Sequence, residues 1–336
     1  MCIALFTTAH PDYALIAIDN RDEYILRPTS RPHWWPHPES GHEVLASRDQ
    51  QRAEQGTWLG ITREGYLAIL TNYRETATPA MATTPISGVR SRGAMVKAWL
   101  GGLPKESVKD GVEQLVSNGG VQGVGGFSMV CTKLRKNGEG LAIVSNRAGD
   151  VEEVPLIARE RGKVWGLSNA VYDERPGQEW PKVQLGKKLL LETVTQEAQA
   201  SQEALVDKLF GVLDTDTLPR QSDDAPFEDY ILQLRHSVFI PAIGDAAHRA
   251  AMAKGPGPVT ERRKSLAAEL RPDPTTAAAL GFDTGLYGTQ RQTVVLVDWE
   301  GEVTFVERAL WDENGNEVPR GEGDVVFRFK IEGWEE

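Results

Sequence analysis

Two neighbouring stretches of sequence decide the fold, MCIALFTT at residues 1–8 and YALIAIDNRDE at residues 13–23. Both are rich in branched and aromatic apolar residues, which favours β-strands from Cys2 to Thr8 and from Tyr13 to Asp19. The intervening Pro11-Asp12 pair is typical of a tight turn. The start of the chain is therefore predicted to form a β-hairpin, which returns the end of its second strand alongside the start of its first.

Outward from this hairpin, strand pairs lie on either side of a central run of helices. Further strands are predicted at residues 57–62, 66–72, 127–132, 141–145, 164–167, 293–298, 303–308 and 325–331. Helical apolar spacing occurs at residues 91–100, 105–118, 183–196 and 202–213. Residues 27–56 and 76–90 are predicted to be surface loops, and residues 214–285 an irregular insertion. This order indicates an α+β protein of antiparallel sheets covered by helices, with residues 1–336 forming one domain.

Composition limits the classes of partner. The 336 residues carry a formal net charge of -11, and the sequence pI is about 5.2. An acidic surface repels phosphate backbones, so no nucleic-acid partner is expected. No apolar run approaches the roughly 18 residues of a transmembrane segment, and the first residues do not resemble a signal peptide. With only Cys2 and Cys131 there is no disulfide framework, so a cytoplasmic, reducing location is expected.

Cys2 is the first candidate for chemistry. If Met1 is removed, Cys2 becomes the N-terminal residue and carries both a thiol and a free α-amine. An unperturbed α-amine has a pKa of about 7.7–8.0, so its neutral form can act as the base that activates the thiol. One residue would then supply both nucleophile and base. The alternative is an ordinary buried strand residue, because cysteine is common in protein interiors.

The motif Asn20-Arg21-Asp22-Glu23 follows the second predicted strand. An arginine fork beside carboxylates can orient a nucleophile and hold its charge. A solvated turn is the alternative, and a short charged string alone would favour it. The predicted hairpin favours the catalytic interpretation, because it places this motif beside Cys2.

Together with Met1-Cys2-Ile3 and Arg27-Pro28, this motif resembles the N-terminus of the NRDE family, which comprises transport and Golgi organisation protein 2 and its relatives. The resemblance continues in the same order through Gly56-Thr57-Trp58-Leu59-Gly60-Ile61, Leu70-Thr71-Asn72-Tyr73-Arg74, Gly126-Phe127-Ser128, Gly166-Leu167-Ser168-Asn169-Ala170, and Tyr287-Gly288-Thr289 with Thr293 to Asp298. It covers residues 1–213 and 286–310, and six collinear blocks are specific where any single block would be weak.

This family resembles N-terminal-nucleophile hydrolases of the bile-salt-hydrolase and penicillin-V-acylase kind. The resemblance implies a four-layer αββα sandwich of antiparallel sheets and the cleavage of an amide C–N bond, with no cofactor required. Cys2 would attack the carbonyl carbon, while Arg21 and Asp22 would hold the α-amine and the thiolate. Asn72 and Asn169 would lie around the scissile carbonyl and stabilise its oxyanion, a turn or cap role being the alternative for both.

The late block departs from the family pattern. Relatives carry an arginine directly after Gly-Thr, whereas this chain has Gln290 there, followed by Arg291. Neighbouring strand residues point to opposite faces of a sheet, so Arg291 could serve only after a local shift of the strand. Otherwise the late cationic group is missing, which weakens the hydrolase interpretation.

Two further interpretations remain open. His33, His37 and His42 could bind a metal or a haem iron, but their spacing fits no zinc motif, so a metal-free surface loop is favoured. The resemblance also implies a non-enzymatic alternative, because the family has been linked to haem mobilisation, lipid handling and secretory-pathway organisation. The partner would then be an apolar ligand, haem or an acyl lipid, in place of a small-molecule substrate. Peripheral Golgi or mitochondrial association is the corresponding alternative to the cytoplasm.

Overall fold

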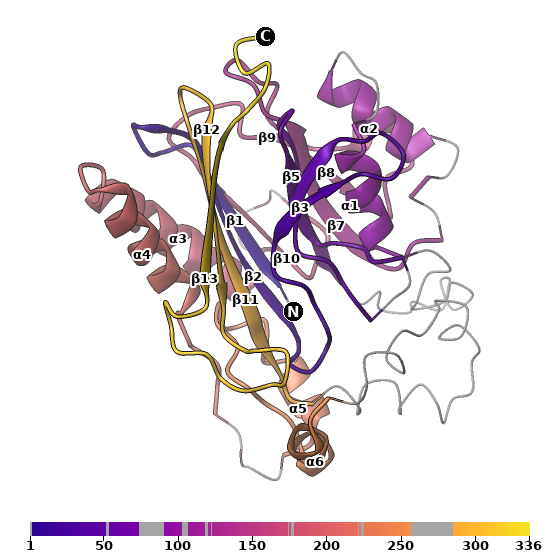
Figure 1. The fold of residues 1–336 in the computed structure, drawn as a ribbon, viewed down its shortest axis with the longest axis vertical. Helices are drawn as coiled ribbons and strands as arrows, with labels where there is room; N and C mark the ends of the chain where they lie inside the picture. Colours follow the sequence, from indigo (N-terminus) through magenta and orange to yellow (C-terminus); the bar gives the residue numbers. More distant parts are fainter. Residues whose placement is uncertain are drawn as a thin grey trace.

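The strands form two antiparallel sheets that lie face to face, with a pair of helices against the outer face of each (Figure 1). The computed structural model describes residues 2–51, 54–73, 91–102, 107–117, 120–121, 123–173, 175, 178–220, 222, 225–256 and 285–336. The predicted loop at 76–90 and the later part of the predicted insertion, residues 257–284, lie outside the described residues.

The predicted N-terminal hairpin is at the centre of a six-stranded sheet with the order β10-β1-β2-β11-β12-β13. Its strands are β1 (Ile3–Thr7), β2 (Tyr13–Tyr24), β10 (Val164–Ser168), β11 (Tyr287–Asp298), β12 (Glu302–Ala309) and β13 (Asp324–Lys330). Ile3 is opposite Asn20 in the β1–β2 pair, which confirms the hairpin. However, β2 continues to Tyr24, five residues beyond the predicted end at Asp19, so the Asn20–Glu23 motif lies within the strand.

A seven-stranded sheet has the order β3-β4-β5-β6-β7-β8-β9. Its strands are β3 (His33–Pro36), β4 (Glu43–Ala46), β5 (Leu59–Thr62), β6 (Tyr66–Asn72), β7 (Phe127–Lys133), β8 (Leu141–Ser145) and β9 (Leu156–Ile157). The prediction of a loop throughout residues 27–56 is wrong, because β3 and β4 belong to this sheet. Their proline- and histidine-rich surroundings hide them, yet Val44 and Leu45 are fully buried once β4 pairs with β5.

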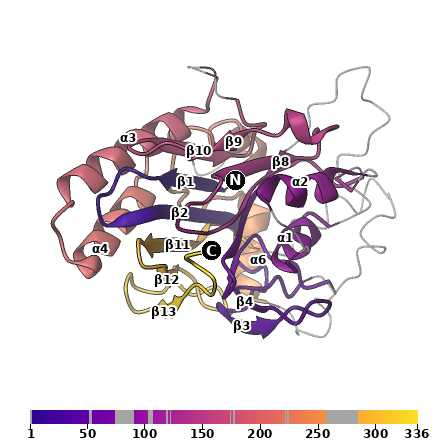
Figure 2. The same cartoon turned by 90° about the horizontal axis from the view of Figure 1, so that it is seen from above.

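Helices α1 (Gly93–Leu100) and α2 (Val108–Val116) cover the outer face of the seven-stranded sheet, and α3 (Pro181–Gln196) and α4 (Gln202–Leu213) cover that of the six-stranded sheet (Figure 2). Alternate residues of β1 serve two cores. Phe6 packs between the sheets, whereas Leu5 packs against α3 and α4. The predicted four-layer αββα sandwich is therefore confirmed.

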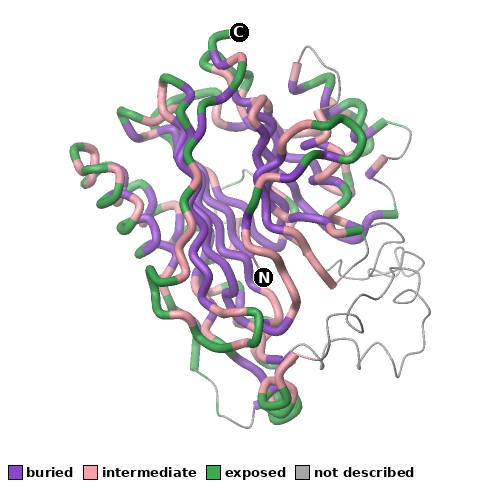
Figure 3. The backbone as a smooth tube through the Cα atoms, viewed as in Figure 1, coloured by how far each residue is buried: buried purple, intermediate pink, exposed green. Residues whose placement is uncertain are grey.

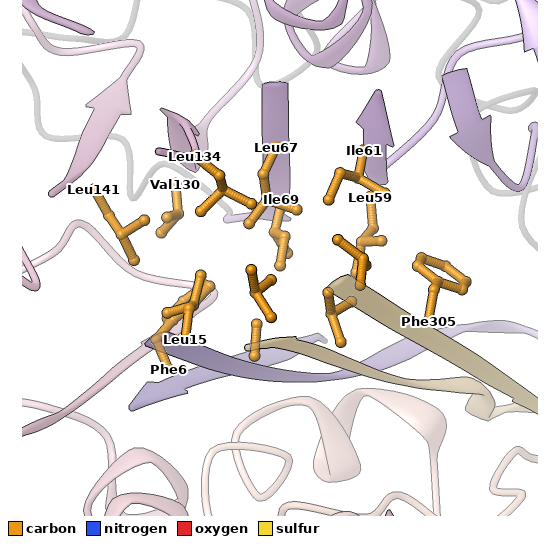
Figure 4. Packing of buried hydrophobic residues seen from close by; sticks show 14 of the residues in the cluster. Phe6, Leu15, Leu59, Ile61, Leu67, Ile69, Val130, Leu134, Leu141 and Phe305 are labelled. Carbon is orange, nitrogen blue, oxygen red and sulfur yellow. The ribbon is translucent and has the colours of Figure 1, made fainter. Parts of the chain in front are cut away.

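The core between the sheets is built from apolar side chains of both, including Phe6, Leu15 and Phe305 from one and Ile61 and Leu67 from the other (Figure 4). Burial is concentrated in the strands, while exposed residues lie on the outer sides of the helices and in the loops (Figure 3). Because strands of both sheets are buried on both faces, their side chains are held in fixed directions.

The described part of the predicted insertion contains two short helices, α5 (Phe227–Ile231) and α6 (Ala246–Lys254). It is anchored by a small apolar cluster that includes Phe227 and Ile240 and contacts Tyr287 of β11. A short 3-10 helix, η2 (Val151–Glu153), precedes β9.

Candidate active site

Cys2 lies just before β1 and borders a pocket between the two sheets. Its side chain is 8% exposed, and its Sγ atom is 3.8 Å from the backbone oxygen of Asp22. The pocket has a volume of about 110 Å³ and is lined by Cys2, Arg21, Asp22, Glu23, Arg27, Asp49, Gly56, Thr57, Trp58, Leu70, Asn72, Ser91, Arg92 and Gly93. Of the six predicted site residues, four line this pocket: Cys2, Arg21, Asp22 and Asn72.

The hairpin explains why Cys2 and Arg21 meet. Ile3 is paired with Asn20, so the residue before the first and the residue after the second are also neighbours. Side chains alternate along a strand, which puts Cys2 on the inter-sheet side with Phe6. The local turn and the strand period therefore bring the thiol and the guanidinium to one face.

Arg21 is buried and held from three sides. Its Nη1 donates to Oε1 of Gln290, and its guanidinium carbon is 4.1 Å from the ring centroid of Trp58. Its Nη2 is 3.9 Å from Oε2 of Glu23. Burial lowers the pKa of Arg21 from its ordinary value, while Glu23 opposes that shift. The result is a fixed cation beside the thiol, with little rotational freedom.

Asp22 points to the opposite face of β2, toward the helical layer. Its Oδ1 accepts a hydrogen bond from the Thr289 hydroxyl at 2.8 Å, and its backbone oxygen accepts one from the Tyr287 hydroxyl at 3.1 Å. Burial raises the pKa of the Asp22 carboxyl, and Lys182 and Thr289 act against that rise. Burial likewise raises the pKa of the Cys2 thiol to about 11, and the carboxyl groups of Asp22 and Asp19 add to this effect.

Asn72 and Asn169 are adjacent but differ in their relation to the pocket. Asn72 ends β6 and lines the pocket, and its buried Oδ1 has no hydrogen-bond partner among the described residues. Asn169 follows β10 and is absent from the lining; its Nδ2 donates to the backbone oxygen of Asn72. The structure thus places the Asn72 amide at the pocket and Asn169 behind it.

Arg291 does not line the pocket. Its Nη1 donates to the backbone oxygen of Trp311 at 2.6 Å, and its Nε lies 3.8 Å from Oε1 of Glu307. Burial lowers the pKa of Arg291 to about 10. The local shift that could have recruited it does occur, because the β2–β11 register changes between Thr289 and Arg291. That irregularity nevertheless presents Gln290, and not Arg291, to Arg21.

Gln290 therefore fills the position where the sequence lacks the expected cation. Its amide Nε2 donates to the backbone oxygen of Ile25 at 2.9 Å and to that of Arg27 at 3.2 Å. These two bonds orient its Oε1 toward Arg21. Gln290, which departs from the family pattern in sequence, therefore helps to hold Arg21 in place.

Lys182, which the sequence reasoning missed, lies directly beneath Cys2. It is fully buried in the first turn of α3, and its Nζ donates to the backbone oxygen of Cys2 at 3.4 Å. One signal could have revealed it: Lys182 falls on the buried stripe of α3 with Gly186, Leu190 and Val194, at a spacing of four residues. A lysine on an apolar stripe is unusual and invites a search for its partner.

Two of the three histidines of the β3–β4 region are neighbours, because the backbone nitrogen of His37 donates to the backbone oxygen of His42 at 2.7 Å. His33 is exposed and His37 is buried beside Trp35, with its pKa lowered by burial. Across the part of the chain that the structure describes, no group of three or more His, Cys, Asp or Glu side chains could hold a metal ion.

The sequence matches the family model described as Transport and Golgi organisation 2 over residues 1–312. The chain belongs to this family. It is 30% identical over 321 residues to the Transport and Golgi organization protein 2 homolog of Bos taurus, covering 92% of this chain and 93% of the bovine protein. The Homo sapiens homolog is 28% identical, covering 94% of this chain and 95% of its own length.

Among solved structures, this Transport and Golgi organisation 2 family member is similar to a penicillin V acylase from Agrobacterium tumefaciens, with a TM-score of 0.42 and 10% identity. That alignment covers 98% of this chain and 86% of the acylase. The Caenorhabditis elegans N-acylethanolamine-hydrolyzing acid amidase ortholog gives a TM-score of 0.40 with 9% identity, over 65% of this chain and 88% of its own. Within the described residues, none of the helices has the length and apolar character needed to cross a membrane.

Proposed function

We propose that this chain is a cysteine-dependent hydrolase that cleaves a small amide, with Cys2 as its nucleophile after removal of Met1. The observation that carries the proposal is the position of the Cys2 thiol at a polar pocket that Arg21, Asp22 and Asn72 also line. A nucleophile, a fixed cation, a carboxyl group and a side-chain amide can together serve acyl transfer.

In the proposed reaction, the neutral α-amine of Cys2 takes the thiol proton, and the thiolate forms a bond to the carbonyl carbon of the substrate. The carbonyl oxygen becomes an oxyanion, for which Asn72 lies at the end of β6 as a donor. One such donor contributes about 2.7–4 kcal/mol in other enzymes. The C–N bond then breaks, and the leaving amine takes the proton from the α-ammonium. Water, deprotonated by the same amine, hydrolyses the thioester and regenerates the thiol.

The dimensions of the pocket favour a small, polar substrate. Its volume is about 110 Å³, and its lining includes three arginines, Arg21, Arg27 and Arg92, with three acidic residues, Asp22, Glu23 and Asp49. Pockets that enclose drug-sized ligands span about 300–1,000 Å³ and are lined mainly by hydrophobic and aromatic side chains. Trp58 and Leu70 supply the apolar part of this lining.

The second candidate is a binding protein for an apolar ligand such as haem or an acyl lipid. The burial of Cys2, which is only 8% exposed, favours it. Burial raises the pKa of the thiol to about 11, so the thiol is almost entirely protonated at neutral pH and is a weak nucleophile. In the hydrolase proposal this thiol depends on the α-amine of Cys2 to remove its proton. The two candidates therefore differ in what removal of Cys2 should do.

The test is turnover of a panel of small N-acyl amides by protein whose intact mass shows that Met1 has been removed. We expect Cys2→Ala to lower turnover by at least about 10³-fold, as loss of a covalent nucleophile does elsewhere. Cys131→Ser is the matched control, because Cys131 is fully buried on β7, away from the pocket lining. Turnover by Cys2→Ala equal to that of the parent protein would refute the proposal. Haem or acyl-lipid binding unchanged in that variant would support the second candidate.

A further inference from the structure

A fully buried lysine lies beneath the nucleophile. Lys182 follows Pro181, which starts α3, and its relative exposure is 0%. The helix is held tightly against the sheet, because a Cβ atom on Gly186 would lie only 2.7 Å from Cδ1 of Leu5. The position of Lys182 under β1 is thus set by close packing, and its side chain has one direction in which to extend.

The contacts of Lys182 converge on Cys2 and Asp22. Its Nζ donates to the Cys2 backbone oxygen at 3.4 Å, and that oxygen also accepts a bond from the Ser168 hydroxyl at 2.8 Å. Burial lowers the pKa of Lys182, and attraction to the Asp22 carboxyl, on β2, and to Cys2, before β1, opposes that shift. Cys2 also interacts with Asp19 and Arg21, both on β2. The Nζ atom of Lys182 also lies 5.9 Å from the ring centroid of the neighbouring residue Trp180.

Packing alone does not explain a lysine at this place. An ammonium buried in a helical layer has a large desolvation cost, which a methionine or leucine of similar size would avoid. The compensation comes from Asp22 and from the Cys2 carbonyl, both of which belong to the candidate site. A functional role is therefore needed to explain the charge of Lys182, whereas its volume could be supplied by an apolar residue.

We infer that Lys182 is a positioning residue of the Cys2 site, and that its ammonium, held against the Cys2 carbonyl, counteracts the Asp22 carboxylate so that the α-amine of Cys2 stays neutral and able to act as a base. This inference rests on the proposed function, because it assigns a role within that mechanism. Lys182 does not touch the substrate. It acts through Cys2, whose carbonyl it holds, and through Asp22, whose charge it balances.

The sign of the effect follows from charge. A carboxylate alone beside the α-amine would stabilise the ammonium form and trap the base in its protonated state. A second cation opposes this. The nitrogen and the carbonyl oxygen of one residue are at most about 3.6 Å apart, which places the Cys2 nitrogen within about 7 Å of the lysine Nζ. At an effective dielectric constant near 20, that separation corresponds to a change of about 1–2 units in the pKa of the amine.

The experiment measures the amine directly and needs no substrate. The full chain is prepared with Cys2 as its first residue and with ¹³C,¹⁵N-labelled cysteine, so that NMR reports on only two residues, Cys2 and Cys131. The pKa of the Cys2 α-amine is then compared between the parent protein, Lys182→Met and Lys182→Arg. Lys188→Met is the matched control, because Lys188 lies on the same helix but its side chain is 70% exposed.

We expect Lys182→Met to raise the pKa of the α-amine by about 1–2 units, Lys182→Arg to restore most of the parent value, and Lys188→Met to leave it unchanged. Turnover is measured in parallel as a function of pH. In Lys182→Met, the decline of turnover on the acid side should move to higher pH by the same amount as the pKa of the α-amine. If Lys182→Met does not fold, Lys182→Gln takes its place in the same titration.

An α-amine pKa that is the same in the parent protein and in a folded, charge-free variant would overturn the inference. That result would leave the hydrolase proposal standing, since Cys2→Ala tests it separately. Conversely, a shifted amine in a protein without amide turnover would sustain the role of Lys182 in setting the amine and refute the hydrolase.

Discussion

Thr289 joins three parts of the site through one hydroxyl group, and Thr289→Val should reveal its contribution. The hydroxyl donates to Oδ1 of Asp22 at 2.8 Å and accepts from the backbone nitrogen of Ile240 at 2.9 Å. The residue is 1% exposed, so no solvent can replace either bond. Valine has nearly the same shape, and the change therefore removes the two hydrogen bonds with little change in packing.

The expected loss of stability follows from the type of each bond. A hydrogen bond to a charged group contributes about 1.5–3 kcal/mol, and a neutral one about 0.5–1.5 kcal/mol. The variant should therefore lose about 2–4 kcal/mol of the free energy of unfolding. For 336 residues, an unfolding entropy of about 2.1 cal/mol/K per residue converts this loss into a fall of about 3–6 °C in the melting temperature.

The assay is thermal unfolding followed by circular dichroism, with Thr304→Val as the matched control. Thr304 is also a buried threonine of the six-stranded sheet, but its hydroxyl donates a bond of 3.2 Å to Oε1 of the neutral amide of Gln202. Its loss should cost about 0.5–1.5 kcal/mol. A fall in melting temperature for Thr289→Val no larger than that for Thr304→Val would refute the reasoning, because Asp22 would then not depend on the hydroxyl.

Two further predictions concern buried groups near the site. Asp19 is buried, with both carboxyl oxygens lacking a hydrogen-bond partner among the described residues, and burial and the Asp22 carboxyl raise its pKa well above the ordinary value. Because the folded-state pKa is raised, the parent protein loses stability as the pH rises above about 4, the ordinary pKa of an aspartate. In urea unfolding, the stability of Asp19→Asn should therefore increase relative to that of the parent protein between pH 5 and pH 8. A stability difference that does not change with pH would contradict this prediction. Gly56→Ala should lower stability by about 1–3 kcal/mol, because its Cβ would lie 3.0 Å from the Gly93 Cα at the start of α1. Gly211→Ala on α4, whose Cβ meets no described atom within 4 Å, should instead gain about 0.5–1 kcal/mol, and equal melting temperatures for the two variants would refute the steric argument.

Part of the site follows from local sequence alone. The Pro11-Asp12 turn and the alternation of the first two strands predict the hairpin, and the hairpin brings Arg21 to Cys2. Asn72 is likewise placed by the end of a strand that the sequence predicts correctly. These features depend on residues close together along the chain, where turn chemistry and the two-residue period set the geometry.

Other parts depend on contacts between distant segments. Strands β3 and β4 escape prediction because their short apolar runs lie among prolines and histidines, and pairing with β5 stabilises them. The positions of Asn169 and Arg291 relative to the pocket also could not be read from the sequence. A register irregularity in β11 turns Arg291 toward Glu307 and presents Gln290 to Arg21.

The sequence by itself determined the family, the α+β class and the meeting of Cys2 with Arg21, because collinear motifs and a local hairpin carry that information. Only the tertiary structure decided which groups of α3 and β11 lie around Cys2 and Asp22. Thr289 reaches Asp22 through the pairing of β11 with β2, and Lys182 reaches Cys2 because α3 packs closely on β1. Such contacts join residues more than 150 positions apart, and their geometry is set by packing and register that no local pattern encodes.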